Sequence, residues 1–265
     1  MSQVTVRIEE AIAILTLLNS PHGEFDGAVV EDLARALDTI EAARGLGAVV
    51  VTGGADGVFG GPYAVRDLEH MGRHQRAAAT TMADDPLPAI GAFARQLARI
   101  EASPLPFVAA INGTCIGAGF DLALACDIRV VEDGDYGLGF PEANIGLAPL
   151  GGGSQRLPRL IGPAKALELI LMGRTVSPLQ ALQIGIAQEM APDLALDAAM
   201  IMAHRLADQS REATASLKRL VREAVTVPLA RGLVAEREAQ ARLIATEEAI
   251  ARMRDVTRGE RDIED

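Results

Sequence analysis

The sequence predicts an α/β fold whose C-terminal part is helical. Residues 11–52 carry a strand pattern, a helix pattern and a buried strand pattern in turn, which is the order of a parallel crossover. An apolar strand at residues 107–111 leads through Asn112-Gly113 into an apolar helix. From about Leu194 onward only helical periodicity remains. We therefore expect an α/β body over residues 1–194 and a helical region over residues 195–265.

The N-terminal elements are predicted from alternation and turn residues. Residues 4–8 alternate as a strand does, residues 11–18 form a second strand, and Glu9-Glu10 is the turn between them. Helical periodicity over residues 27–44 ends at glycines, and residues 48–52 form a short buried strand.

The middle of the chain is less regular. Residues 53–63 are too rich in glycine for an ordinary connection, and we expect a loop. Residues 64–88 are partly helical and contain two prolines, so we expect a mobile segment that acts as a lid. Residues 90–101 then predict a helix.

The second half alternates between loops and helices. Residues 129–131 continue the strand pattern, and Pro141-Glu142 lies in an expected loop. Helix patterns follow at residues 154–160 and 163–172, after Ser177-Pro178, and at residues 194–208, 211–225 and 229–253, with an edge strand at residues 186–190.

Composition excludes several classes of partner. The chain has 265 residues, 25 Lys plus Arg and 36 Asp plus Glu, and therefore a net charge of −11. An acidic protein without a basic run is a poor binder of nucleic acid or of anionic membranes. Residues 107–128 approach the hydropathy of a membrane span, but Asn112, Asp121 and Asp127 make that placement costly.

The two cysteines and the N-terminus indicate a location. Cys115 and Cys126 match no zinc or redox spacing, so we expect buried free thiols. Residues 1–10 contain no apolar signal segment. Both observations favour the cytoplasm.

The central stretch carries the first candidate site. Gly117-Ala118-Gly119 precedes an apolar helix that has one acid, Asp121, in its first turn. The first N–H groups of a helix have no partner within it, and glycine lets a ligand approach them. Such donors beside an acid suit chemistry on a carbonyl group, although small residues that only permit tight packing would give the same pattern.

Three segments resemble the enoyl-CoA hydratase/isomerase (crotonase) superfamily in order and spacing. They are residues 51–61, residues 111–129 and residues 141–157. The most specific pieces are Ala110-Ile111-Asn112-Gly113 with Gly117-Ala118-Gly119, and Gly152-Gly153-Ser154-Gln155-Arg156-Leu157. The resemblance covers nearly the whole chain. It implies a spiral of ββα units followed by a helical trimerisation region, and a homotrimer or dimer of trimers.

The resemblance also implies an acyl-CoA substrate and assigns roles to residues. Two backbone N–H groups, at Gly61 and Ala118, bind the thioester oxygen and stabilise the enolate that forms. Glu142 exchanges the proton at the α-carbon or activates water, and Asp121 stands where hydratases have a second glutamate. Two neighbouring carboxylates can divide the acid and base roles. No metal or redox cofactor is implied, because coenzyme A belongs to the substrate.

The chain departs from the family pattern at several positions. The first oxyanion loop reads Gly61-Pro62-Tyr63-Ala64, with Ala64 in place of the usual Asp. We expect this loop to border the substrate, with the Tyr63 hydroxyl either in the acyl pocket or in a structural role. Leu150 occupies the place of the third acid of the dienoyl-CoA isomerases. In the loop that commonly contacts the CoA nucleotide basic residues are missing, and His22 is either a partial substitute or an exposed loop residue.

These residues predict an acyl-CoA lyase that adds water to a 2-enoyl-CoA thioester or removes it. The alternatives are another reaction of the superfamily, either double-bond isomerisation or C–C hydrolysis of a CoA thioester, and a non-catalytic acyl-CoA binder. Retention of acids at both positions favours the addition or removal of water.

Overall fold

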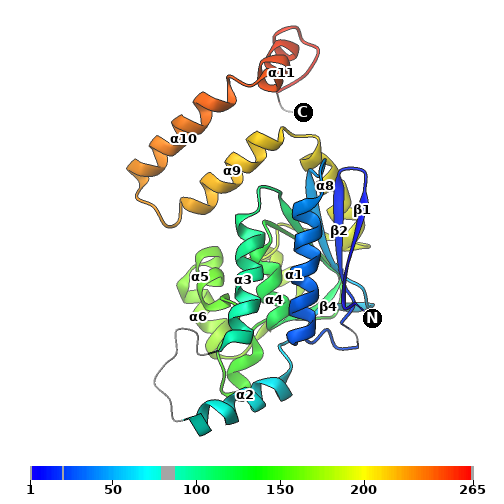
Figure 1. The fold of residues 1–265 in the computed structure, drawn as a ribbon, viewed down its shortest axis with the longest axis vertical. Coiled ribbons are helices and arrows are strands. Elements are labelled where there is room, and N and C mark those ends of the chain that lie inside the picture. Colours follow the sequence, from blue (N-terminus) through cyan, green and yellow to red (C-terminus); the bar gives the residue numbers. More distant parts are fainter. Residues whose placement is uncertain (1, 20, 79–86, 264–265) are drawn as a thin grey trace.

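Two β-sheets form the centre of the molecule, with helices packed around them (Figure 1). The structure is a computed structural model that describes residues 2–19, 21–78 and 87–263. Helices α9, α10 and α11 of the C-terminal region lie to one side of this body.

Six strands form the larger sheet, with β1 antiparallel to β2 and every other neighbouring pair parallel. In sheet order they are β1 (Val4–Glu9), β2 (Ile12–Leu17), β3 (Ala48–Gly53), β5 (Phe107–Ile111), β7 (Ile128–Glu132) and β10 (Glu189–Ala191). The smaller sheet has the order β4 (Gly57–Gly60), β6 (Gly113–Ile116), β8 (Leu138–Gly139) and β9 (Thr175–Val176).

The chain passes repeatedly from the larger sheet to the smaller one. Strands β3, β5 and β7 belong to the larger sheet, and the strand that follows each of them, β4, β6 or β8, belongs to the smaller. Helices follow each strand pair: α1 (Gly27–Ala42) after β1 and β2, α2 (Val65–Ala78) and α3 (Pro88–Ala102) after β4, α4 (Ala118–Ala125) after β6, and the 3-10 helix η1 (Pro141–Ile145) with α5 (Gly153–Ile161) after β8. This arrangement confirms the predicted spiral of ββα units.

The larger sheet is buried on both faces. Along β3, Val49 and Val51 point into the main core, whereas Val50 points to a second core on the other face. Helix α8 (Ala195–Ala207) covers that second face with a stripe of three fully buried alanines, Ala195, Ala199 and Ala203. Because both faces are covered, the strands read as continuous apolar runs.

Helix α8 follows directly on the predicted domain boundary at residue 194. It packs against β3, β5 and β7 of the body. The division into two domains stays a prediction. Helices α9 to α11 lie to one side of the body (Figure 1).

The predicted helix over residues 229–253 is wrong, because the chain forms two helices there. Helix α10 (Leu229–Leu243) ends at Ile244, and α11 (Glu247–Thr257) begins after Thr246. The Thr246 side chain accepts a hydrogen bond from Ala249 N at 3.2 Å, as an N-cap residue does. The remaining helices are α6 (Pro163–Leu171), α7 (Pro178–Gln183) and α9 (Arg211–Glu223). Ser177 and Gln180 form a capping box at α7, as its Ser-Pro start predicts.

Two segments that predict loops contribute strands instead. Residues 53–63 contain β4, and Asn112-Gly113 leads directly into β6, with which β4 pairs. Here glycine serves close approach, because a Cβ on Gly113 would lie 1.9 Å from the carbonyl carbon of Gly57. The Asn112 amide also bonds to Gly53 and Ala55, which holds the β3–β4 connection. The glycine content of these segments therefore predicted loops wrongly, because here glycine allows two strands to pair closely.

The expected lid at residues 64–88 and the apolar residues 107–128 are each divided between several parts of the structure. Residues 65–78 of the expected lid are helical in α2, and residues 79–86 lie outside the described residues. The apolar residues 107–128 are divided between β5, β6 and α4. Across the described ranges, each helix falls short of the length and hydropathy needed to cross a membrane.

Candidate active site

Asp121 is a fully buried acid in the first turn of α4. Its Oδ2 accepts a hydrogen bond from Gly151 N at 2.7 Å, whereas its Oδ1 is buried and has no hydrogen-bond partner in the described chain. Burial raises the pKa of Asp121 to about 7, while the Gly151 hydrogen bond and the charge of Arg156 oppose this rise and the charge of Glu142 adds to it. A carboxyl with such a pKa can both donate and accept a proton near neutral pH.

Glu142 is the second buried acid. It lies in η1, where Pro141 fixes the first position of the short helix. Burial raises the pKa of Glu142, and within the described residues its Oε2 has no hydrogen-bond partner. A buried, unpaired carboxylate oxygen is costly unless a substrate or a water completes its hydrogen bonds.

Gly117 lets Glu142 and Pro62 approach the start of α4, the helix that carries Asp121. Asp121 N donates to Gly117 O at 2.9 Å, so Asp121 lies one turn beyond this glycine. A Cβ on Gly117 would lie 2.7 Å from Glu142 Oε1 and 2.8 Å from Pro62 Cα. Gly117 also has φ = +55°, which favours glycine. The absence of a side chain therefore allows the Glu142 carboxylate and the Pro62 loop to meet at the start of α4, where the charge of Glu142 also acts on Asp121.

Ala118 supplies a free donor at this point. It is the first residue of α4, so its N–H has no partner within the helix, and the described part of the chain offers it no acceptor. The positive end of the helix dipole lies at the same place. Its position agrees with the predicted role in binding an oxyanion.

The predicted second donor, Gly61, is already engaged. Gly61 N donates to Gly23 O at 2.7 Å, and Gly61 O accepts from Gly119 N at 2.9 Å. Its N–H is therefore not available to a substrate in this conformation. A tertiary partner far back in the chain decides this, so the local motif could not predict it.

Tyr63 has the available N–H in this loop. Phe25 N donates to Pro62 O at 2.9 Å and Ala64 N donates to Phe25 O at 2.7 Å, so both flanking peptides face Phe25. The N–H of Tyr63 belongs to the same peptide group as Pro62 O. In a trans peptide the C=O and the N–H point in opposite directions, so the N–H of Tyr63 points away from Phe25. Among the described residues it has no acceptor. The Tyr63 ring is buried in the main core, which fits the structural role for its side chain.

An apolar groove of about 340 Å³ lies beside the acids, between α2 and the segment that precedes Gly151. Leu68, Met71, Gly72 and Gln75 recur at the spacing of one helix face and line it from α2. Leu147 and Leu150 line its other side, together with Leu87. Leu150 precedes Gly151, whose N–H binds Asp121, so the groove begins next to the buried acids.

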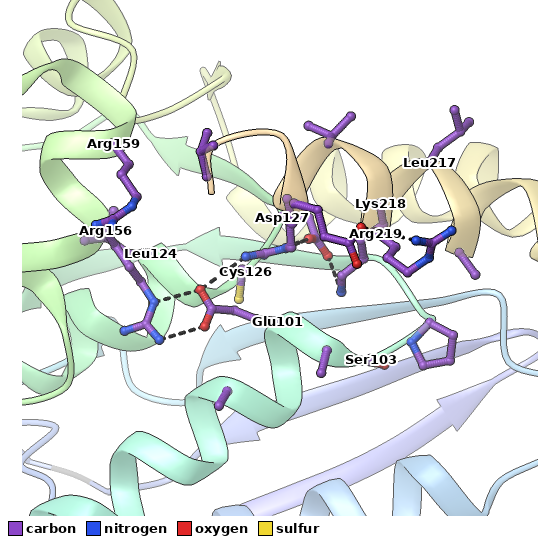
Figure 2. Close-up of a pocket in the computed structure, with 18 of the residues that line it drawn as sticks. Glu101, Ser103, Leu124, Cys126, Asp127, Arg156, Arg159, Leu217, Lys218 and Arg219 are labelled. Carbon is purple, nitrogen blue, oxygen red and sulfur yellow. Dashed lines mark hydrogen bonds and ion pairs between the residues drawn. The ribbon is translucent and has the colours of Figure 1, made fainter. Parts of the chain in front are cut away.

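A larger cleft of about 1720 Å³ lies between α9 and the body. Figure 2 shows its lining, with Arg156 and Glu101 on the body and Lys218 on α9. The Lys218 ammonium donates to Ile100 O and Leu105 O and pairs with Asp127. These contacts attach α9 to the body of the same chain.

Sequence reasoning missed three contributors to the site: the N–H of Tyr63, the N–H of Gly151 and the side chain of Arg156. The glycine-rich segment that contains Gly151 was visible as a motif, but its contact with Asp121 spans 30 residues. Throughout the described ranges, no cluster of three His, Cys, Asp or Glu side chains has the arrangement of a metal site.

Comparison with known proteins agrees with this geometry. The family model described as "Enoyl-CoA hydratase/isomerase" matches residues 7–255. A probable enoyl-CoA hydratase of Bacillus subtilis is 32% identical over 224 residues, which are 83% of this chain and 82% of that protein. The 2,3-dehydroadipyl-CoA hydratase of Escherichia coli is 32% identical over 252 residues, 94% of this chain and 92% of that protein.

Solved structures give the same result for the fold. An enoyl-CoA hydratase from Bacillus anthracis has a TM-score of 0.86 and 26% identity, covering 97% of this chain and 96% of that chain. An enoyl-CoA hydratase from Polaromonas has a TM-score of 0.87 and 28% identity, covering 97% of each chain. The fold predicted from the sequence motifs is confirmed.

Proposed function

The chain belongs to the enoyl-CoA hydratase/isomerase family and is an enzyme of that type, and we propose that it adds water across the double bond of a 2-enoyl-CoA thioester or removes it. One observation carries this proposal. Asp121 Oδ1 and Glu142 Oε2 are both buried without partners in the described residues, beside two free backbone N–H groups. A polarised thioester and one water molecule complete these hydrogen bonds.

The thioester oxygen is the group that the backbone donors bind. In the proposed complex it accepts hydrogen bonds from Ala118 N–H and Tyr63 N–H. Negative charge grows on this oxygen as the enolate forms, so fixed donors stabilise the transition state more than the ground state. Gly61 supports this arrangement through its bonds to Gly23 and Gly119.

The acids divide the handling of one water molecule. Both carboxylates hold the water, and its oxygen forms a bond to the β-carbon while the π electrons of the double bond move toward the thioester oxygen. One proton of the same water reaches the α-carbon through Glu142, so the product is a 3-hydroxyacyl-CoA and no other reactant is consumed. The steps use only protein groups and water, in line with the expectation that no metal or redox cofactor takes part.

The acyl group is proposed to lie in the groove under α2. Its lining residues in the described chain include no Lys or Arg, and five of the seven are Leu or Met. Leu150 stands at its inner end, so this position offers apolar contact rather than a third acid. These properties favour an apolar acyl chain and weigh against a dienoyl-CoA isomerase.

Assembly as a homotrimer or dimer of trimers remains part of this proposal. Apolar side chains on α9 to α11 are exposed in the single chain, including Val221 and Leu229 at 70% and 77% exposure. Burial of such side chains against a second copy would be favourable by about 25 cal/mol for each Å². The buried free thiols Cys115 and Cys126 fit the proposed cytoplasmic location.

Turnover of crotonyl-CoA tests the reaction. Loss of the enoyl-thioester absorbance is followed for the wild type, for Glu142→Gln and for a control, Glu168→Gln, at an acid exposed on α6. We expect a 3-hydroxybutyryl-CoA product from the wild type and the control, and a loss of at least about 100-fold in Glu142→Gln. A product of unchanged mass would indicate isomerisation, and binding without turnover would favour a non-catalytic role. C–C hydrolysis is tested separately with a cyclic β-keto thioester, in which water cleaves the C–C bond and opens the ring.

A further inference from the structure

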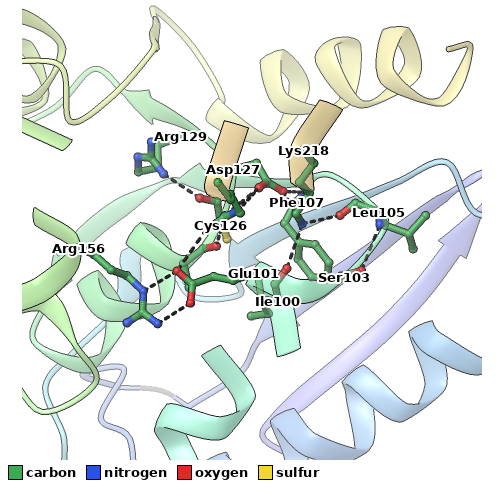
Figure 3. A network of polar contacts seen from close by, with 12 residues as sticks. Ile100, Glu101, Ser103, Leu105, Phe107, Cys126, Asp127, Arg129, Arg156 and Lys218 are labelled. Carbon is green, nitrogen blue, oxygen red and sulfur yellow. Dashed lines mark hydrogen bonds and ion pairs between the residues drawn. The ribbon is translucent and has the colours of Figure 1, made fainter. Parts of the chain in front are cut away.

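Arg156 of α5 lies behind Asp121, on the far side of the Gly151–Gly152 turn. On the basis of the proposed function, we propose that Arg156 is a positioning residue that fixes Gly151 so that its N–H donates to Asp121. The assignment rests on hydrogen bonds that run from Arg156 through Gly151 to the Asp121 carboxylate. Figure 3 shows the other side of the same guanidinium, which pairs with Glu101.

The guanidinium of Arg156 is held in one orientation. Its Nε and Nη2 donate to the two carboxylate oxygens of Glu101, each at 2.8 Å. This two-bond arrangement fixes the plane of the guanidinium as well as its position. Glu101 ends α3, so the anchor belongs to a helix packed in the core.

The third donor of Arg156 reaches the backbone. Nη1 donates to Gly151 O, in the peptide that follows Gly151, while Asp121 Oδ2 binds the N–H of the peptide that precedes it. Gly151 is thereby held on both sides. Residues 151–153 are three consecutive glycines, which have the widest backbone freedom of any residue type. Among the described residues, Asp121 and Arg156 are the two side chains that hydrogen-bond to Gly151, so without Arg156 the Asp121 bond would be the one that remains.

The charge of Arg156 acts on the same carboxylate. Burial raises the pKa of Asp121, and Arg156 and the Gly151 hydrogen bond are the influences that oppose it most. Glu142 faces Asp121 with a like charge, which adds to the rise. Removal of Arg156 therefore removes a nearby positive charge and loosens the hydrogen bond, and both changes favour protonated Asp121.

Arg156 is also linked to the C-terminal helices. Glu101 pairs with Arg222 of α9 at 3.2 Å, and Arg222 pairs with Asp127 at 2.7 Å. Burial alone would raise the pKa of Glu101, but its bonds and charges with Arg156 and Arg222 hold it below its ordinary value. Glu101 therefore stays charged and continues to accept both hydrogen bonds from Arg156.

The test compares Arg156→Met with the wild type in crotonyl-CoA hydration between pH 5.5 and 9. A matched control is Arg159→Met, one turn further along α5, whose exposed side chain donates, within the described residues, to the Gln155 carbonyl of its own helix. We expect kcat of Arg156→Met to fall about tenfold or more at pH 6.5 and to recover to within about threefold at pH 8.5, with little change in KM. Arg156→Lys keeps the positive charge but loses the two-bond pairing with Glu101, so its kcat at pH 6.5 should lie between those of the wild type and Arg156→Met.

A loss that is equal at every pH would overturn the positioning role, as would an unchanged profile. Full recovery of kcat in Arg156→Lys would also overturn it, because the charge alone would then be sufficient. Infrared absorption of the protonated carboxyl, with Asp121→Asn as baseline, gives a second readout that needs no turnover. The Asp121 band should persist to higher pH in Arg156→Met than in the wild type. If crotonyl-CoA is not turned over at all, the reaction assignment fails while this titration still decides the role of Arg156.

Discussion

Replacement of Asp121 by Asn should abolish activity and yet stabilise the fold, increasingly so as the pH rises. Asp121 is fully buried, and its pKa rises from an ordinary value of 3.8 to about 7 in the folded protein. Between these values the unfolded chain has lost the proton while the folded protein keeps it, so the folded state becomes less stable as the pH rises. Asn has the same shape, bears no charge and can still accept the Gly151 hydrogen bond.

The magnitude follows from the linkage between proton binding and folding. Each pH unit between the two pKa values corresponds to ~1.4 kcal/mol. Asp121→Asn should therefore raise the free energy of unfolding by about 1.5 kcal/mol at pH 5 and about 4 kcal/mol at pH 8.5. Denaturant unfolding at both pH values measures this difference, with the exposed Asp193→Asn as control. A gain that is independent of pH, or a loss at pH 8.5, would refute the reasoning that burial sets the protonation of Asp121.

Three further substitutions test the geometry. Tyr63→Phe should keep at least about half of kcat, because the buried ring stays in the core and only the backbone N–H serves the substrate; a loss above about tenfold in the hydration assay would place the hydroxyl in the reaction. Gly117→Ala should reduce kcat at least about 100-fold, because its Cβ would lie 2.7 Å from Glu142 Oε1. The control is Gly57→Ala, which is also at positive φ but has open space around it. It should cost about 1 kcal/mol of stability. Gly72→Leu adds a side chain into open space in the groove. It should lower kcat/KM for octenoyl-CoA relative to crotonyl-CoA by about tenfold. If the ratio of the two kcat/KM values were the same in Gly72→Leu and Gly72→Ala, the groove would be excluded as the acyl site.

The fold could be predicted well where one periodicity dominates. Strands β2, β3 and β5 are apolar runs buried on both faces, and α1 repeats its apolar residues on one side, so local pattern and tertiary environment agree. Prediction failed where glycine is compatible with both a loop and closely paired strands. The glycines of β4 and β6 allow strands to pair closely, yet the same residues in isolation indicate a loop. It also failed at residues 244–246, where an N-cap at Thr246 begins a new helix inside a continuous helical pattern.

The candidate site divides in the same way. Asp121 and Ala118 were predicted from their place at the start of an apolar helix, whereas Glu142 was predicted from the resemblance to the family; the structure places both acids in buried positions. The second donor could not be predicted. Pro62 has no N–H, the N–H groups of Gly61, Tyr63 and Ala64 are chemically alike, and the bonds to Gly23 and Phe25 decide which of them is free. The role of Arg156 could not be predicted for a related reason. Its partner Glu101 lies 55 residues away, and it acts on Asp121 through the backbone of Gly151, a residue without a side chain. In this protein residue types therefore identify the acids, whereas the donors and the group that orients them are selected by backbone contacts between distant segments.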